Sequence, residues 1–493
     1  MRKITIAIYI CLLIWQTKAP GQCPATVPTF SINSPSATAG RTYLLSDAIR
    51  NTAGELVGIG IKQEAGATDW HVYFAKYNSN GQFIGVPQRI TPTSGSLPVS
   101  YNFIESKTAF ITEAFDATGN PNGYMIAVNT SLSLDKDIWV ARLDPGGCVV
   151  WSRRLGFNND GVDEIARGIF RSGTDNYAIL AVRNPNNFGN MVIHEMDGAG
   201  AACTSHEFAT GFEPLGMTPL TPGAFGNAVW AVCGDEYANY GGKPGFVLLD
   251  AGFQEINGIG DVFDPDVSDP DNHHPIDLVQ VGSSLFVIGA TASNSGKGWL
   301  MKLSWSQSTP GVDLAYDWSK IIDWPDDPGF FVQYDVPWDI EAKNDTLAIG
   351  GWSYWSDPSL PYRPWLMTIK NDGTLLQSKR LTHSAAQFGI LHKVINLPNQ
   401  GYYLAGQQWN NLGQSGGTQA YAARCDNNLV IGSCMCNADQ LFQTPDIMGA
   451  FEGLIDFPLN SVPCQNNAMT AQCIADDNSQ QSAFSPPSPI IAK

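Results

Sequence analysis

The sequence is poor in charged residues, and poorest in basic ones. Charged side chains make up 15% of its 493 residues, and 46 Asp and Glu face only 28 Lys and Arg, for a formal net charge of −18. A surface of this sign repels phosphate backbones and anionic lipid headgroups. After Trp15 no apolar run approaches the roughly 20 residues that a membrane-spanning helix needs. We therefore expect no nucleic-acid partner and no membrane span.

The chain also lacks the short motifs of several large enzyme classes. It contains no HExxH, no GxSxG and no phosphate-binding glycine loop, and its seven histidines are scattered. Each of those motifs would fix a nucleophile, a metal pair or a phosphate cradle at a set spacing. The sequence thus indicates no particular reaction, and any catalytic group would have to converge in three dimensions.

The first residues have the features of a secretory signal. Two basic residues come first, an apolar run covers 4–15, and small residues follow at Ala19 and Gly21. A membrane anchor is the alternative, but it would need a longer apolar run. We therefore expect residues 1–21 to be a signal peptide and the protein to be secreted or held on the outer cell surface.

What the chain does contain is a repeated unit. Seven times an apolar segment runs into a polar turn, and consecutive turns are 53 to 66 residues apart. With 49 Gly and 31 Pro, the composition favours strands and turns over helices. A period of about 50 residues is typical of a propeller with one four-stranded sheet per repeat. We predict an all-β fold, a single β-propeller of seven four-stranded blades over residues 43–436. The turns follow Tyr77, Leu143, Met196, Leu249, Leu303, Ile369 and Arg424.

Several features of the repeat predict how the blades pack. Trp139, Trp299 and Trp365 each stand four residues before a turn. Tryptophan inside a strand is more often packing than a sugar platform, so we expect these rings to lie between blades. A small residue recurs late in the apolar second strand, which suits a position crowded near the ring axis. Those small residues are Ala181, Gly289, Gly350 and Gly406.

Asp144, Asp197 and Asp250 begin equivalent turns of the repeat. Aspartate side chains commonly accept hydrogen bonds from backbone amides one or two residues further on, which stabilises a turn. This capping role accounts for an aspartate at each of the three turns, so no contact with a ligand is needed to explain them.

The repeat is flanked by segments of different composition. Residues 22–42 are rich in Ser, Thr and Pro, and we expect either a lead-in or a closing strand for the last blade. The repeat stops near Ala438, and residues 437–493 predict an irregular, cysteine-containing tail or linker.

Cysteines concentrate near the end of the chain. Ten are present, Cys11 leaves with the signal, and five of the remaining nine lie within 425–473. An exported protein can keep disulfides, although an odd number leaves at least one cysteine out. We expect bonds that tie the last blade to the tail. Zinc binding is the alternative, but no CxxC pair supports it.

One stretch of the repeat resembles a known family. Residues 137–156 read DIWVARLDPGGCVVWSRRLG, a W-V-x-K/R-L-D turn followed by glycine, tryptophan, a basic residue and glycine. This pattern is similar to extracellular β-propeller repeat proteins of Bacteroidota-type bacteria. The resemblance implies a secreted or surface-attached propeller, and the family has no general catalytic motif that could be carried over.

An aromatic-rich loop is the first candidate site. The sixth copy contains GWSYWSDPSLPY over 351–362, and aromatics on a loop favour recognition more than aromatics inside a strand. We expect a ligand to contact Trp352, Tyr354, Trp355 and Tyr362.

An acidic loop is the second candidate. Asp264, Asp266, Asp269 and Asp271 stand at nearly alternate positions, and such carboxylates could bind calcium. The spacing lacks the glycine and terminal glutamate of an EF-hand loop, so a solvated acidic loop is the competing interpretation. A second acidic turn covers 323–328, and the two together would form an anionic rim if they open on one face.

The function that fits these features best is binding. We expect a monomeric propeller that serves as a binding or scaffold module for a glycan, a protein or an envelope component. The alternative is a polysaccharide-acting hydrolase or lyase with its site at the axial mouth, since propellers also carry enzymes. That alternative would require two carboxyl groups about 5–10 Å apart in a central cleft.

Overall fold

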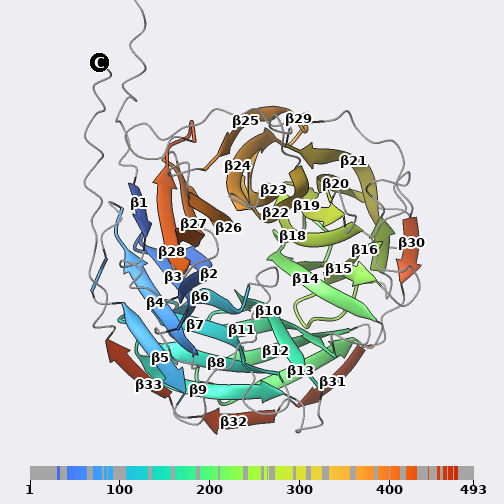
Figure 1. The fold of residues 1–493 in the computed structure, drawn as a ribbon. Coiled ribbons are helices and arrows are strands. Elements are labelled where there is room, and N and C mark those ends of the chain that lie inside the picture. Colours follow the sequence, from blue (N-terminus) through green and yellow to red (C-terminus); the bar gives the residue numbers. More distant parts are fainter. Residues whose placement is uncertain are drawn as a thin grey trace, which may run out of the picture.

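The structure, a computed structural model, is a ring of seven antiparallel sheets (Figure 1). Every regular element within the described residues is a β-strand, which confirms the prediction of an all-β propeller with seven blades. The described residues are 30–33, 42–63, 70–79, 83–85, 87–92, 107–130, 136–156, 162–184, 189–208, 211–236, 243–256, 260–263, 265, 273–291, 296–306, 313–324, 332–355, 362–381, 387–398, 400–410, 418–429, 442–443, 452–455, 459–463, 465–469 and 471–475.

Blades 1 to 6 each consist of four consecutive strands, and the first strand of each lies nearest the axis. Blade 1 is β2 (Thr42–Arg50), β3 (Leu56–Gln63), β4 (Trp70–Tyr77) and β5 (Gln88–Pro92); blade 2 is β6 (Ala109–Phe115), β7 (Pro121–Thr130), β8 (Asp137–Leu143) and β9 (Val149–Gly156); blade 3 is β10 (Glu164–Arg171), β11 (Asn176–Arg183), β12 (Asn190–Asp197) and β13 (Cys203–Phe208). Blade 4 is β14 (Phe212–Pro219), β15 (Trp230–Glu236), β16 (Lys243–Leu249) and β17 (Gly260–Phe263); blade 5 is β18 (His273–Val281), β19 (Ser284–Thr291), β20 (Gly298–Ser306) and β21 (Asp313–Asp323); blade 6 is β22 (Val332–Lys343), β23 (Thr346–Trp355), β24 (Tyr362–Lys370) and β25 (Leu375–Arg380).

The seventh blade combines the two ends of the ring. Its inner three strands are β26 (Gln387–Leu397), β27 (Gly401–Asn410) and β28 (Thr418–Cys425), and its outer strand is β1 (Phe30–Asn33). The register runs antiparallel from Phe30 opposite Arg424 to Asn33 opposite Tyr421. Residues from the segment 22–42 therefore complete the blade built from the end of the repeat.

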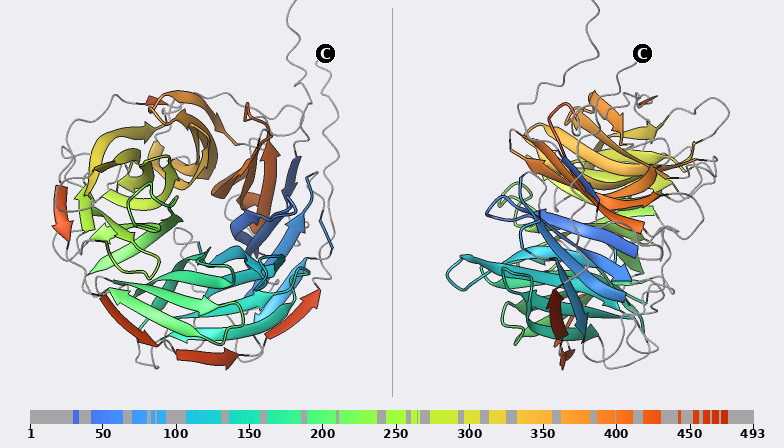
Figure 2. Two further views of the ribbon diagram at one scale, coloured as in Figure 1. Left: turned by 180° about the vertical axis from the view of Figure 1, so that it is seen from behind. Right: turned by 60° about the vertical axis from the view of Figure 1, so that its left-hand side comes forward.

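The segment after the repeat forms regular strands, which the sequence did not predict. Its described residues form five short strands, and each pairs antiparallel with the outer strand of one blade, in the reverse of chain order from blade 5 to blade 1. Figures 1 and 2 show these strands in red around the outer rim. We call the five together the belt. They are β29 (Phe442–Gln443) on β21, β30 (Glu452–Ile455) on β17, β31 (Leu459–Pro463) on β13, β32 (Gln465–Met469) on β9 and β33 (Ala471–Ala475) on β5.

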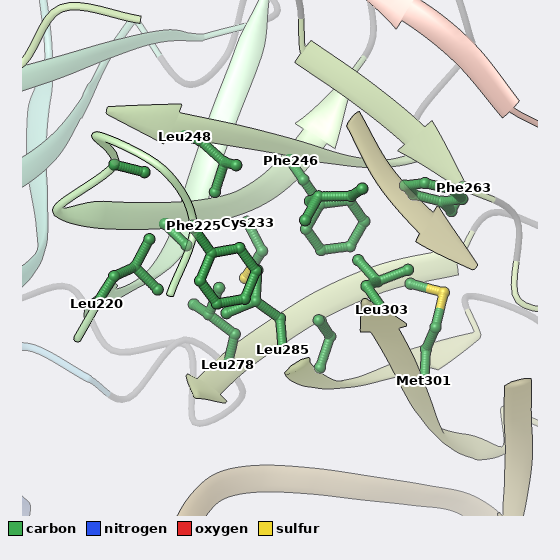
Figure 3. Packing of buried hydrophobic residues seen from close by; sticks show 14 of the residues in the cluster. Leu220, Phe225, Cys233, Phe246, Leu248, Phe263, Leu278, Leu285, Met301 and Leu303 are labelled. Carbon is green, nitrogen blue, oxygen red and sulfur yellow. The ribbon is translucent and has the colours of Figure 1, made fainter. Parts of the chain in front are cut away.

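The hydrophobic core is divided into clusters, and the larger ones lie between neighbouring blades. Figure 3 shows the one between blades 4 and 5, where Phe225, Phe246, Leu285 and Leu303 pack together. Fully burying a large apolar side chain contributes about 1.5–3 kcal/mol, so stacking of blades supplies the main stabilisation of the ring. Trp139, Trp299 and Trp365 are fully buried in such clusters, which confirms the prediction that their rings lie between blades.

The recurring small residues lie where two strands approach closely. A Cβ added to Gly289 would stand 2.2 Å from the carbonyl oxygen of His274 in the innermost strand. A Cβ on Gly406 would stand 2.1 Å from the carbonyl oxygen of Ile390. Crowding next to the innermost strand therefore explains the absence of a side chain, as expected.

The turn aspartates act as caps. Asp144 Oδ1 accepts hydrogen bonds from the backbone amides of Gly146 (2.8 Å) and Cys148 (2.9 Å). Asp250 Oδ1 accepts equivalent bonds from Gly252 (2.8 Å) and Gln254 (2.9 Å). The structural interpretation of these residues is confirmed.

The cysteines correct one expectation. Cys425, in the last blade, is a buried free thiol, so it supplies no bond between that blade and the tail. Burial raises the pKa of its thiol to about 12, which keeps it protonated. Cys203, in blade 3, is disulfide-bonded instead. Within the described part of the chain, no helix is long and apolar enough to cross a bilayer.

Candidate functional site

The direction of the strands sorts the connections onto two faces of the ring. We call the face where the innermost strands begin the upper face, and the face where they end the lower face. Successive strands of a blade are antiparallel, so the connections from the second to the third strand and from one blade to the next both belong to the upper face. The described residues of the predicted aromatic site stand at this face, near the end of β23 and at the start of β24.

The side chains of the predicted calcium site are not among the described residues. Asp264, Asp266, Asp269 and Asp271 lie outside the described residues, in the part of the sequence between β17 and β18. Among the residues that the structure does describe, no group of three or more His, Cys, Asp or Glu could hold a metal ion. Calcium binding therefore stays a prediction.

The predicted aromatic site is brought together in part. The rings of Trp352 and Tyr362 are 5.4 Å apart, and those of Tyr354 and Tyr362 are 5.2 Å apart, at the upper end of blade 6. Trp352 is only 4% exposed, whereas the two tyrosines are half-buried. The side chain of Trp355 is outside the described part of the structure. Trp352 thus forms the floor of the cluster, and among the three rings that the structure describes the two tyrosines are the ones accessible to a ligand.

A tryptophan links this aromatic cluster to the ring axis. Trp338 belongs to the same cluster as Trp352, and its ring lies 5.8 Å from that of His392. Lys107, from blade 2, donates from Nζ to the carbonyl oxygen of Trp338 in blade 6 at 3.2 Å. Blades 2 and 6 are not neighbours, so this lysine reaches across the axis. Burial, and then the charge of Lys107, lowers the pKa of His392 to about 3, and that imidazole is neutral.

An axial cavity of about 380 Å³ lies between the innermost strands of all seven blades. Exposed Arg171 and Pro219 line it at the ends of β10 and β14, so it opens toward the lower face. Its walls combine apolar residues such as Phe110, Trp230 and Leu278 with a nearly equal share of polar surface. Four acidic and four basic side chains share this lining: Asp47, Asp277, Asp339 and Glu341, and Lys107, Arg167, Arg171 and Lys393.

The acidic residues of the cavity share a structural role. Asp47, Asp277 and Asp339 each follow a bulge in an innermost strand, and each carboxylate accepts a hydrogen bond from a backbone amide of the next blade. The bonds run from Ile111 N to Asp47 (3.0 Å), from Ile340 N to Asp277 (3.4 Å) and from Val394 N to Asp339 (2.8 Å). Such a bond between an amide and a carboxylate fixes one blade against its neighbour.

Asp339 and Lys393 form the ion pair at the centre of this group. Lys393 Nζ donates to Asp339 Oδ1 at 2.6 Å, and Asp339 is fully buried. Burial acts to lower the pKa of Lys393, but Asp339, Asp47 and Asp277 together raise it above its ordinary value. The lysine therefore stays charged, and it holds the carboxylates around it in place.

Two of the cavity carboxyls titrate near neutral pH. Burial raises the pKa of Asp277 to about 6, against the attraction of Lys107. Burial also raises the pKa of Glu341 to about 7, where Lys393 opposes the shift and Asp339 adds to it. The backbone amide of Asn396, in the next blade, donates to Glu341. All four carboxyls of the cavity thus bind a backbone amide of a neighbouring blade.

A second polar group inside blade 3 has the residue types of a catalytic triad but no access for a substrate. His194 Nδ1 lies 2.7 Å from Ser205 Oγ, and His194 Nε2 lies 3.4 Å from Glu164 Oε2. All three side chains are at most 1% exposed. A nucleophile must reach a carbonyl carbon, so this group stabilises the blade and does not catalyse.

Sequence reasoning did not name any of the axial charged residues. A signal was present, because Asp47, Asp277 and Asp339 occupy the same place in the first strand of their copies. Asp277 and Asp339 even share the pattern Pro-x-Asp. The sequence did not show that these carboxylates lie around one axis, or that each accepts a hydrogen bond from a backbone amide of the next blade.

Comparison with known proteins adds little beyond the fold. No family model matches the chain, and no curated protein sequence matches it significantly. Similar solved structures include the hemagglutinin-neuraminidase ectodomain of parainfluenza virus 5, at 10% identity and a TM-score of 0.34, covering 81% of this chain and 86% of that one. An apocarotenoid oxygenase of Synechocystis has 11% identity and a TM-score of 0.38, with coverages of 79% and 88%. Drosophila Semaphorin 2a has 9% identity and a TM-score of 0.25, with coverages of 78% and 76%. At these scores the likenesses say nothing about ligand or reaction.

Proposed function

We propose that this protein is an exported, non-enzymatic binding propeller that holds a neutral, hydroxyl-rich ligand, such as the end of a glycan chain, in its axial cavity. The charge balance of the cavity carries the proposal. The chain as a whole has a formal charge of −18, yet the cavity lining has four acidic and four basic side chains. A balanced set of donors and acceptors suits a polar ligand without net charge.

The size and walls of the cavity support the same ligand class. Small-ligand sites are commonly about 300–1,000 Å³, mostly apolar, with a few fixed polar groups. A cavity of about 380 Å³ lies near the lower end of that range and would hold one or two sugar rings. Half-buried Ile49, Leu215 and Val279 offer apolar surface against which the apolar face of a sugar can pack.

The carboxylates argue for binding rather than hydrolysis. Glycosidases need one carboxyl to protonate the leaving oxygen and another to attack or to activate water. In this ring each cavity carboxyl accepts a backbone amide of the next blade, and Asp339 is also paired with Lys393. Groups held in this way are suited to orient a ligand. Export is part of the proposal, supported by the signal-like residues 1–21 and by the resemblance to secreted bacterial propeller repeats.

The test is a glycan array probed with the chain lacking residues 1–21, followed by calorimetry on each glycan that binds. Thr112 lines the cavity in blade 2, so Thr112→Trp should fill it and weaken binding at least ten-fold. Thr174→Trp is the matched control, because Thr174 is exposed in a turn at the same lower face and does not line the cavity. We expect the control to bind like the wild type.

Two results would overturn the proposal. Equal binding by Thr112→Trp and the wild type would remove the cavity as the site. Release of new reducing ends from a bound glycan would show an enzyme, and the polysaccharide-hydrolase alternative would replace binding.

A further inference from the structure

The strands of the belt are too short to be held firmly by backbone pairing alone, and a cysteine lies next to one of them. Its five strands are only two to five residues long, and each lies on the outer strand of a different blade. Pairing of so few residues is marginal in water. Cys203 begins β13, the outer strand of blade 3, and it is disulfide-bonded. Its partner lies outside the residues whose side chains are described.

The strand register identifies the partner. In the ladder between β13 and β31, Ser205 is opposite Val462 and Thr204 is opposite Pro463. One further step along the same antiparallel ladder places Cys203 opposite the residue that follows Pro463, which is Cys464. Directly opposed residues in antiparallel strands have Cα atoms about 4.5–5.5 Å apart, and disulfides join Cα atoms about 4.4–6.8 Å apart.

The other cysteines within the described residues are placed less well for this bond. Cys148, Cys233 and Cys425 are thiols and not part of a disulfide. Cys473 belongs to β33, where it is opposite Ile90 in blade 1 rather than in blade 3. The chain neighbours of Cys464, in contrast, are both described: Pro463 ends the strand on blade 3 and Gln465 begins the strand on blade 2.

We propose that a disulfide between Cys203 and Cys464 fastens the belt to the rim of the ring at blade 3. Two thiols lose two protons and two electrons to a disulfide oxidant of an oxidising compartment, and that oxidant is reduced to a dithiol. The bond holds β31 and β32 at the edges of blades 3 and 2 even while their short ladders open, because tethering raises their effective concentration. Bonds of this kind persist in exported proteins, so the proposal also bears on where the chain matures.

The bond can be mapped because methionines separate the candidate cysteines. The full chain is exported to an oxidising compartment, its thiols are blocked with N-ethylmaleimide, and it is cleaved with cyanogen bromide in acid without reduction. Cys203 then lies in fragment 197–217, Cys464 in 449–469, Cys473 in 470–493 and Cys436 in 436–448. We expect 197–217 linked to 449–469 in the mass spectrum, and loss of that species on reduction.

Any other state of Cys203 overturns the proposal. A link from 197–217 to 470–493 would assign Cys473, and a link to any other fragment would assign a different cysteine. A maleimide-modified Cys203 would show that no bond forms. None of these results depends on the identity of the ligand, so this proposal and the binding proposal fail separately.

A second measurement tests what the bond does. In Cys464→Ser, the backbone amides of β31 and β13 that pair across the ladder should exchange with deuterium at least ten-fold faster than in the wild type. Cys473→Ser is the control, because its strand pairs with blade 1, and it should leave exchange in β13 unchanged. Unchanged exchange in Cys464→Ser would contradict the fastening role.

Discussion

The blades of this propeller are joined by different means at the axis and at the rim. At the axis, single aspartates accept backbone amides of the next blade, and Asp339 also binds Lys393. At the rim, backbone of one distant segment pairs with five outer strands in turn. The bonds at the axis depend on a few charged side chains, whereas the contacts at the rim depend on many weak backbone pairs. Substitutions at the axis and removal of the belt compare how much each kind of contact stabilises the ring.

The largest effect is expected for Asp339→Ala. The change removes the fully buried carboxylate that pairs with the ammonium of Lys393 and leaves the amide of Val394 without its acceptor. Removing one partner of a buried ion pair costs about 3–5 kcal/mol of unfolding free energy. Urea unfolding followed by tryptophan fluorescence measures it. Asp372→Ala is the control, because Asp372 caps an exposed turn of blade 6 through Thr374, and its effect should be much smaller. Equal losses in the two variants would refute the special role of the axis.

The next largest effect is a dependence of stability on pH. Burial raises the pKa of Glu341 to about 7, above its ordinary value of 4.5. Below pH 4.5 both the folded and the unfolded states carry the proton. As pH rises from 4.5 to 7, the unfolded state loses its proton first, so the ring loses stability. The loss from this group is about 1–3 kcal/mol.

Glu341→Gln tests that dependence directly. The variant should match the wild type near pH 4 and exceed its unfolding free energy at pH 8, as measured by urea unfolding at each pH. The unfolding free energy of the variant still falls in part as pH rises, because burial also raises the pKa of Asp277 to about 6. Parallel curves for variant and wild type across this range would show that Glu341 does not contribute.

Truncation of the belt should have a smaller effect on the ring itself. A chain ending at Leu429 loses all five belt strands but keeps every axial bond. We expect a fall of about 1–2 kcal/mol in unfolding free energy, a range typical of lost peripheral contacts. Five newly exposed outer strands should also increase self-association, since unpaired strand edges recruit other chains. Sedimentation velocity at several protein concentrations detects this; a truncated chain that stays monomeric and as stable as the full chain would contradict it.

Axis and rim also differ in how far the sequence predicts them. The seven copies are visible because each repeats a buried strand and a capped turn, as at Asp144 and Asp250, and local chemistry alone dictates both. The axial aspartates occupy equal places in their copies, but their convergence arises from ring closure, which no single copy encodes. The belt strands were not predicted, because a strand such as β32 (QNNAM) is polar and short. Such a strand forms because it pairs with the outer strand of a blade, and its own sequence has no alternating hydrophobic pattern that would predict it.

The smallest effect is expected at an edge that the described belt does not cover. Within the described residues β25 of blade 6 has no strand on its outer side, and its Leu376 is 44% exposed. Charged residues on edge strands prevent pairing with other chains. Leu376→Lys should therefore change the unfolding free energy by less than about 0.5 kcal/mol, the usual limit for surface substitutions. Added to the chain that ends at Leu429, the same substitution should lower its self-association only slightly, again by sedimentation velocity, because the five strands that the belt covered stay exposed. If Leu376→Lys instead destabilises the ring as strongly as loss of the belt, the rim of blade 6 is packed against something, and the contrast between covered and open edges fails.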